Sequence, residues 1–81
     1  MRLPRDLPGA ELARLLRRYG YEISRQTGSH LRLTTAMMGT EHHVTIPAHR
    51  TLKLGTLASI VTEVATYLKK DREDLADELF D

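Results

Sequence analysis

The spacing between apolar residues changes at Gly20, and this change constrains the fold more than any other feature. Before Gly20, apolar side chains recur at intervals of three and four residues, which places them on one side of a helix. These residues are Leu12, Leu15, Leu16 and Tyr19. Glycine commonly follows the last helical residue, because it readily adopts the left-handed conformation that ends a helix. We therefore expect a helix over about residues 9–19.

After Gly20, apolar and polar residues alternate, which is typical of strands with one buried face. The apolar members of three such segments are Tyr21 and Ile23, Leu31 and Leu33, and Val44 and Ile46. A tight turn over residues 27–29 and a looser stretch over residues 35–41 join the segments. Because these connections are short, we expect three half-buried strands in an antiparallel sheet with one free face.

The buried face determines how the second and third strands align. Residues that lie opposite each other in a sheet share a face, so the apolar residues of the second strand should pair with those of the third. This register places His30 on the free face, near Thr45 or Pro47. It also makes His49 a neighbour of His30.

Two more helices are expected after the sheet. Gly55 and Thr56 predict the start of the first, with Thr56 as its N-cap. Its apolar stripe comprises Leu57, Ile60, Val61, Val64 and Leu68. Asp71 predicts the N-cap of a short acidic helix over about residues 71–80, which would dock through Leu75, Leu79 and Phe80. The fold class is thus α+β, a small α-β-β-β-α domain over residues 1–81, with a core over about residues 9–68 and an added C-terminal helix.

Composition excludes several classes of protein. The 81 residues include no cysteine, which rules out disulfides, thiol catalysis and cysteine metal sites. No apolar segment approaches the roughly 20 residues needed to cross a bilayer, and no signal-peptide pattern opens the chain, so we expect a cytoplasmic protein. Residues 1–55 hold nine lysines and arginines against four acidic residues, whereas residues 56–81 hold three against seven. The basic part suits a polyanion, although a solvated charged surface would have the same composition.

The turn formed by Gly28, Ser29 and His30 is the candidate for chemistry. Gly28 and Ser29 suit a tight turn, and His30 then opens the second strand with its imidazole on the sheet surface, at a rim. Histidine can gain or lose a proton near neutral pH. A lone Gly-Ser-His sequence is weak support by itself, because Gly-Ser is common in turns and a histidine in a strand is usually polar surface.

The remaining histidines do not predict a metal site. His42 and His43 are adjacent, so in a strand their side chains point to opposite faces. Neither they nor His49 has the spacing of a metal-binding set. We expect these three to be surface histidines, and we expect no metal and no cofactor.

Several segments in combination resemble the HicA family of toxin endoribonucleases. They are Leu15, Leu16, Gly20-Tyr21, Arg25-Gln26, Gly28-Ser29-His30, Val44-Thr45-Ile46-Pro47, His49, Gly55-Thr56-Leu57 and Ile60, over about residues 9–64. The resemblance implies a fold like a double-stranded RNA-binding domain and metal-independent cleavage of mRNA. It also implies neutralisation by a HicB-type antitoxin and a catalytic histidine in the Gly-Ser-His turn, here His30. The loop over residues 35–41 and the acidic helix from Asp71 lie outside the matched pattern.

Polar residues around this turn are candidates for binding RNA phosphates. They are Ser29, Arg25, Arg32, Arg50, Lys53 and Thr56. Arg25 flanks the turn, and Arg32 lies on the free face two residues from His30, so either guanidinium could hold a phosphate. The other site is the start of the second expected helix, where free backbone N–H groups at Thr56 and Leu57 would attract an anion.

Three functions remain open at this point. The first is an endoribonuclease in which His30 is the general acid or base, with His49 as an auxiliary residue. The second is a non-catalytic RNA-binding module of the same fold, in which His30 only donates or accepts a hydrogen bond. Both would bind RNA in a salt-sensitive way, but only the first would create new RNA ends. The third is a subunit that binds protein through its acidic helix and has no affinity for RNA.

Overall fold

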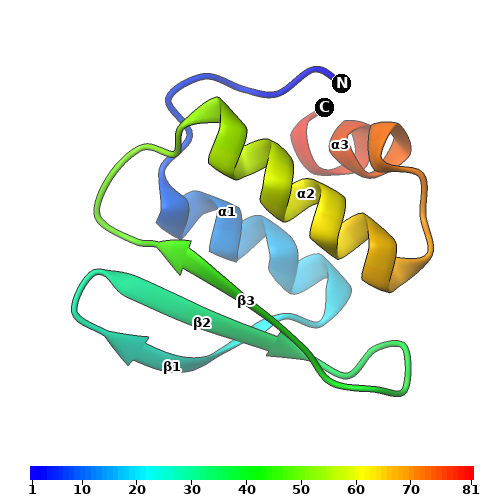
Figure 1. The fold of residues 1–81 in the computed structure, drawn as a ribbon, viewed down its shortest axis with the longest axis horizontal. Coiled ribbons are helices and arrows are strands. Elements are labelled where there is room, and N and C mark those ends of the chain that lie inside the picture. Colours follow the sequence, from blue (N-terminus) through cyan, green and yellow to red (C-terminus); the bar gives the residue numbers. More distant parts are fainter.

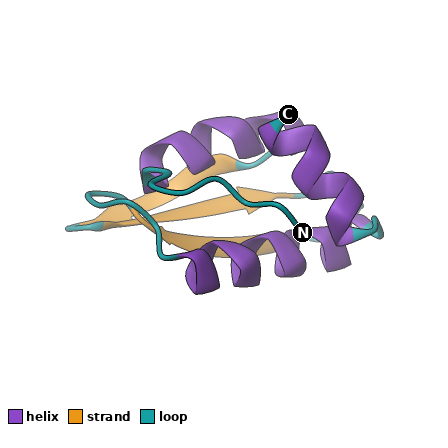
Figure 2. Cartoon of the chain, turned by 90° about the horizontal axis from the view of Figure 1, so that it is seen from above, coloured by secondary structure: helices purple, strands orange, loops and turns teal.

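A computed structural model describes residues 1–81, and its helices and sheet form two layers (Figure 1). The elements in chain order are α1 (Gly9–Leu16), the 3-10 turn η1 (Arg17–Tyr19), β1 (Glu22–Thr27), β2 (His30–Thr35), β3 (His42–Pro47), α2 (Leu54–Leu68) and α3 (Arg72–Phe80). Figure 2, which looks onto the helical layer, shows the strands between and behind the helices. The predicted α+β fold, with its α-β-β-β-α order and added C-terminal helix, is confirmed. None of the helices combines the length and apolar character needed to cross a bilayer.

Helix α1 packs tightly against the end of β3. A Cβ atom on Gly9 would lie 1.7 Å from the carbonyl oxygen of Pro47, so no residue with a side chain fits at the start of this helix. The apolar stripe faces the core, where Leu12 and Leu16 are almost fully buried. Gly20 has a φ of 83° and follows η1 in the left-handed conformation. The predicted helix over residues 9–19 is therefore confirmed, with its last turn in 3-10 form.

The sheet has the strand order β1-β2-β3, and both pairs are antiparallel. Leu31 lies opposite Ile46 and Leu33 opposite Val44, as their shared burial predicted, and all four side chains are buried. The same register pairs His30 with Pro47. The alignment that places His30 at the rim of the free face is thus confirmed.

Strand β1 differs from the prediction, because all six of its residues are exposed. Tyr21 is fully buried but precedes the strand, and the side chain of Ile23 is 54% exposed even though it pairs with buried Leu33. The expected half-buried strand was wrong because β1 is an edge strand that the helices do not cover. A bulge between Ile23 and Arg25 further interrupts its ladder, at Ser24.

The start of α2 also differs from the prediction. The helix begins at Leu54, and Lys53 is its N-cap with no side-chain hydrogen bond. Thr56 is therefore the third residue of the helix rather than its N-cap. The Leu57 N–H already donates to the Lys53 carbonyl at 2.9 Å, which shows that the first helical turn closes before the predicted start. The predicted apolar stripe is correct, because every one of its residues is buried.

Helix α3 begins where the sequence predicts. A carboxylate oxygen of Asp71 accepts hydrogen bonds from the backbone N–H groups of Glu73 and Asp74, the arrangement of a capped helix. Leu75 and Leu79 are buried against the rest of the core, and Phe80 packs at its margin. At the far end, Tyr19 donates a hydrogen bond to Glu78. Burial, assisted by this bond, raises the pKa of Tyr19 to about 12.

Candidate functional site

A surface cavity of about 410 Å³ lies where the β1–β2 turn meets the segment between β3 and α2. Its lining is almost entirely polar and comprises Ser29, His30, Pro47, His49, Arg50, Thr51, Leu52, Lys53 and Thr56. Six of these nine were sequence candidates, namely Ser29, His30, His49, Arg50, Lys53 and Thr56. No carboxylate lines the cavity, so its charged groups are basic.

The β1–β2 turn holds His30 at the edge of this cavity. Gly28 has a φ of 50°, a left-handed conformation that glycine adopts without strain. The carbonyl of Ser29 then accepts a hydrogen bond of 2.7 Å from the N–H of Ala48, which ties the turn to the chain just after β3. The His30 side chain is left exposed, and its only polar contact is a long one of 3.4 Å between Nδ1 and the Ser29 hydroxyl.

His49 reaches the same cavity from the other side. Its Nε2 lies 3.2 Å from the Gly28 carbonyl oxygen, so the imidazole bridges the segment after β3 to the turn before β2. This residue is also exposed. The predicted proximity of His49 to His30 is confirmed in that both imidazoles line one cavity.

The segment between β3 and α2 is more regular than the sequence suggests. Leu52 donates a backbone hydrogen bond of 2.7 Å to the Leu7 carbonyl, and Gly9 donates one of 3.2 Å to the Arg50 carbonyl. Pro8 and Thr51 form an isolated antiparallel bridge between them. The N-terminal segment thus shapes the cavity wall. Sequence reasoning missed the place of Thr51 in it, because no periodic pattern reveals a bridge between two irregular segments.

The first turn of α2 supplies an anion-attracting edge to the cavity. The N–H groups of Leu54, Gly55 and Thr56 have no helical carbonyl before them to bond. The free donors therefore lie earlier than predicted, and Leu57 is not among them because its N–H is bonded to Lys53. Lys53 lines the cavity beside them. A phosphate at this edge would meet backbone donors and a cationic side chain together.

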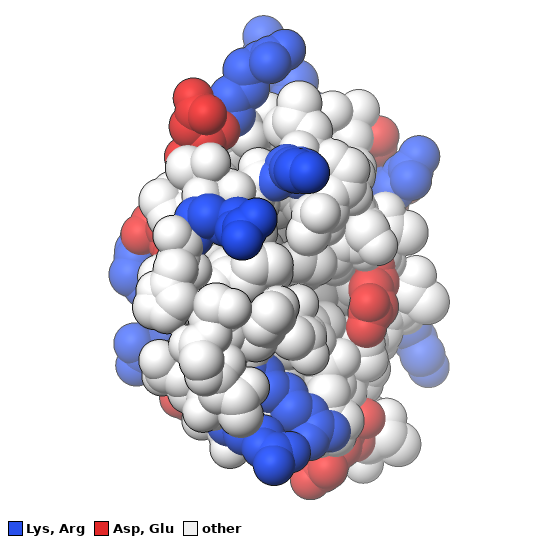
Figure 3. Space-filling view, turned by 60° about the vertical axis from the view of Figure 1, so that its left-hand side comes forward, with Lys and Arg blue, Asp and Glu red and all other residues white.

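Arg25 and Arg32 lie outside this cavity. They face each other directly across the β1–β2 ladder, and neither guanidinium has a carboxylate within 4 Å. Like charges opposite each other in a sheet are unfavourable, so an anion between them would relieve the repulsion. Figure 3 shows the basic side chains at this end of the molecule in separate groups, not in one continuous field.

The other two histidines lie toward the opposite end of β3. His42 accepts a hydrogen bond at Nδ1 from the Tyr21 hydroxyl (2.7 Å), has Glu63 3.2 Å from Nε2, and stacks on the Tyr67 ring. Burial raises the pKa of the Tyr21 hydroxyl, which keeps it protonated and donating. His42 was predicted to be a surface histidine, and this was wrong, since its side chain is only 20% exposed.

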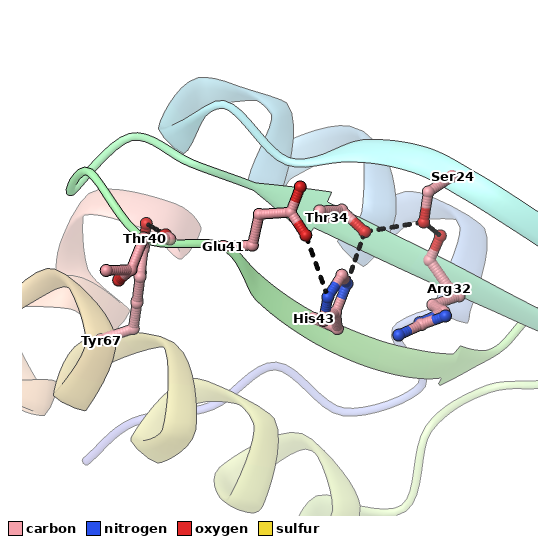
Figure 4. A network of polar contacts seen from close by, with 7 residues as sticks. All are labelled: Ser24, Arg32, Thr34, Thr40, Glu41, His43 and Tyr67. Carbon is pink, nitrogen blue, oxygen red and sulfur yellow. Dashed lines mark hydrogen bonds and ion pairs between the residues drawn. The ribbon is translucent and has the colours of Figure 1, made fainter.

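His43 points to the free face, which confirms that the two adjacent histidines occupy opposite faces. Its Nδ1 lies 2.7 Å from the Thr34 hydroxyl, and that hydroxyl lies 2.7 Å from Ser24 (Figure 4). The Nε2 atom is 3.6 Å from a carboxylate oxygen of Glu41. The Ser24 hydroxyl also donates a hydrogen bond to the Arg32 carbonyl, so the chain of contacts ends on the β2 backbone, opposite the β1 bulge.

Comparison with known proteins adds one match. A family model described as "HicA toxin of bacterial toxin-antitoxin" matches residues 9–70, which include α1, the whole sheet and α2. No curated protein and no solved structure matches the chain. The cavity residues all lie inside the matched region, whereas α3 lies beyond it.

Proposed function

Because this chain belongs to the HicA family, the toxins of bacterial toxin–antitoxin systems, we propose that it is an endoribonuclease that cleaves mRNA without a metal ion. In this proposal His30 is the general acid or base. RNA carries its own nucleophile, the 2′-hydroxyl, so a protein that moves protons and neutralises the phosphate can cut it.

The observation that carries the proposal is the setting of His30. Its imidazole is exposed in a cavity whose other charged or titratable lining residues are His49, Arg50 and Lys53, with no carboxylate among them. Such a cavity attracts a phosphodiester rather than a cation. The imidazole can then exchange a proton with an oxygen of the bound phosphodiester.

The other candidate residues fit two phosphate positions. Arg50, Lys53 and the first turn of α2 near Thr56 would hold the phosphate at the cavity, with Ser29 beside it. Arg25 and Arg32 would hold a neighbouring phosphate on the free face of the sheet. The RNA would thus run from the free face past His30 into the cavity.

A toxin needs a partner that silences it, and the family implies an antitoxin. We propose a HicB-type protein that covers the cavity rim and the free face, with His30 or Arg32 in the interface. Hydrogen exchange of the complex tests this arrangement. Protection around the β1–β2 turn is expected, and protection confined to α3 would show a remote mode of control.

The test of the proposed activity is cleavage of a defined mRNA by the purified protein in excess EDTA. New RNA ends are expected with or without the chelator. Cleavage that stops in EDTA and returns with a divalent ion would contradict the mechanism. Salt-sensitive RNA binding without new ends would instead support the alternative, a non-catalytic RNA-binding module. No RNA binding at all would leave only a protein-binding role.

A further inference from the structure

His49 is the second imidazole in the cavity, and its geometry differs from that of His30 in one informative way. A carbonyl oxygen can only accept a hydrogen bond, so the 3.2 Å contact between His49 Nε2 and the Gly28 oxygen requires the proton to be on Nε2. In neutral His49 the lone pair is therefore on Nδ1. No other polar contact uses that nitrogen, so it remains free to accept a proton.

His30 has the complementary arrangement. Its Nδ1 lies 3.4 Å from the Ser29 hydroxyl, and its Nε2 has no polar partner. Protonated His30 can therefore present an N–H to a substrate oxygen. Two imidazoles in one cavity, one with a free acceptor and one with a free donor, suit the two proton transfers of cleavage through the 2′-hydroxyl.

We infer that His49 is the general base and His30 the general acid of one cleavage step. This inference rests on the proposed function. His49 removes the proton of the 2′-hydroxyl while its oxygen forms a bond to the adjacent phosphorus. The bond from phosphorus to the 5′-oxygen breaks, and His30 donates its proton to that oxygen. The products are a 2′,3′-cyclic phosphate and a 5′-hydroxyl, with no change in oxidation state, and solvent returns both histidines to their starting protonation.

The charged groups around the two imidazoles support this assignment. Arg50 and Lys53 line the same cavity and can neutralise the phosphate as negative charge grows on it. No acidic side chain faces either imidazole from the turn, from the end of β3 or from α2, since none lines the cavity. The pair therefore exchanges protons with substrate and solvent rather than with a neighbouring carboxylate.

The decisive variant is His49→Gln. Glutamine keeps an N–H that can donate to the Gly28 carbonyl but has no group that titrates near neutral pH. If His49 is the base, His49→Gln and His49→Ala both lose about 10²-fold or more in cleavage rate. If His49 only holds the turn, His49→Gln restores the rate of the wild-type protein, which would overturn the inference. His43→Ala is the matched control, because His43 is an exposed histidine outside the cavity.

The pH dependence separates the two roles. The wild-type protein should show a bell-shaped profile of kcat/KM, with the acidic limb set by the base and the alkaline limb by the acid. His49→Gln should lose the acidic limb, whereas a residual activity of His30→Ala should lose the alkaline limb. An unchanged bell for His49→Gln would contradict the assignment.

A chemically altered RNA provides a second readout. An RNA with sulfur in place of the 5′-oxygen at the cleavage site has a leaving group that needs no proton. It should restore cleavage by His30→Ala but not by His49→Gln. Rescue of the His49 variant would overturn the assignment of roles. If wild-type protein cuts neither RNA, the proposed function itself fails, and if all His49 variants cut like wild type while His30→Ala does not, only this inference fails.

Discussion

The four histidines form two pairs near opposite ends of β3, and the pairs differ in how many partners they have. His42 contacts Tyr21, Glu63 and Tyr67, and His43 contacts Thr34 and Glu41. His30 and His49 each have one polar contact and share a cavity. The comparison indicates that an imidazole needs a free ring nitrogen to react with a substrate. An imidazole with both nitrogens in contact with other side chains is more suited to holding the fold, whatever its exposure.

The distinction has a physical cause. A histidine whose two nitrogens are both engaged must break a hydrogen bond before it can exchange a proton with a substrate. At the His42 end, those bonds join the start of β3 to α2 and to the residue before β1. At the His30 end, a backbone hydrogen bond from Ala48 to Ser29 joins the turn to the segment after β3, beside the single contact of His49 with Gly28.

His30→Ala should have the largest effect, which is a loss of RNA cleavage rate. General acid or base catalysis contributes roughly 10²- to 10⁴-fold in rate, so cleavage and toxicity on expression should be nearly abolished. The side chain is exposed, so the free energy of unfolding should change by about 0.5 kcal/mol or less. Cleavage assays and urea unfolding on the same protein check both points. An unfolded variant would show a structural histidine, and a folded variant that still cuts would place the catalytic residue elsewhere.

A second test asks whether His30 and His49 lie in the phosphate site. Arg50→Glu with Lys53→Glu should weaken RNA binding and reduce the slope of log affinity against log salt by about 2, since each lost phosphate contact lowers it by about 1. Thermal stability should be nearly unchanged, because both side chains are exposed. Titrations at several salt concentrations measure the slope. If affinity is unchanged, the RNA surface moves to the arginines of α1 and η1, and Arg17→Glu becomes the next variant.

Substitution at His42 should have the opposite effect to substitution at His30, with a loss of stability and no loss of cleavage. His42→Ala leaves the part-buried Tyr21 hydroxyl without its partner and removes the stacking on Tyr67. The expected loss is about 1–3 kcal/mol of unfolding free energy, with the cleavage rate of the folded protein retained. Urea unfolding of His42→Ala and His43→Ala, with His30→Ala for comparison, gives the ranking. Equal stability of the three variants would break the distinction between the pairs.

The smallest expected effect is a loss of stability at alkaline pH, caused by Tyr21, the partner of His42. The pKa of Tyr21 is raised in the folded protein, above its usual value of about 10, chiefly by burial. Because the folded pKa is the higher one, this contribution to stability is complete below about pH 10 and falls as the pH rises further. Tyr19, with its pKa of about 12, adds a similar loss between about pH 10 and 12. Tyr21→Phe should flatten the fall of unfolding free energy above pH 10, and parallel curves for the two proteins would show that Tyr21 does not contribute.

Much of the fold could be predicted because apolar residues recur at regular intervals along the chain, and most of these residues are buried. The register of β2 and β3 followed from Leu31, Leu33, Val44 and Ile46, and it alone placed His30 at the rim. The prediction failed for Ile23, because alternation reveals which side of a strand is apolar but not whether a helix covers it. It failed for Thr56, because the N-cap is Lys53, whose side chain makes no capping hydrogen bond that the sequence could reveal.

The partners of His42 were not predictable from spacing. Tyr21, Glu63 and Tyr67 come from separate parts of the chain, and only the packing of α2 against the sheet brings them to one imidazole. The cavity was more predictable, because the tight turn at Gly28 and Ser29 has a local signal and the register of β2 and β3 places His30 beside Pro47. Its wall at Thr51 was not, because it depends on a bridge to Pro8.

Helix α3 has a practical consequence for work with shortened chains. The family match ends at residue 70, which makes that position an inviting place to trim the protein. Yet Glu78 accepts a hydrogen bond from the Tyr19 hydroxyl, and Leu75 and Leu79 are buried in the same core as Leu68. Removing α3 would expose a contiguous apolar surface of the kind that promotes aggregation. A trimmed protein that precipitates or fails to cut RNA would therefore reveal nothing about the cavity, and the full 81-residue chain is the one to assay.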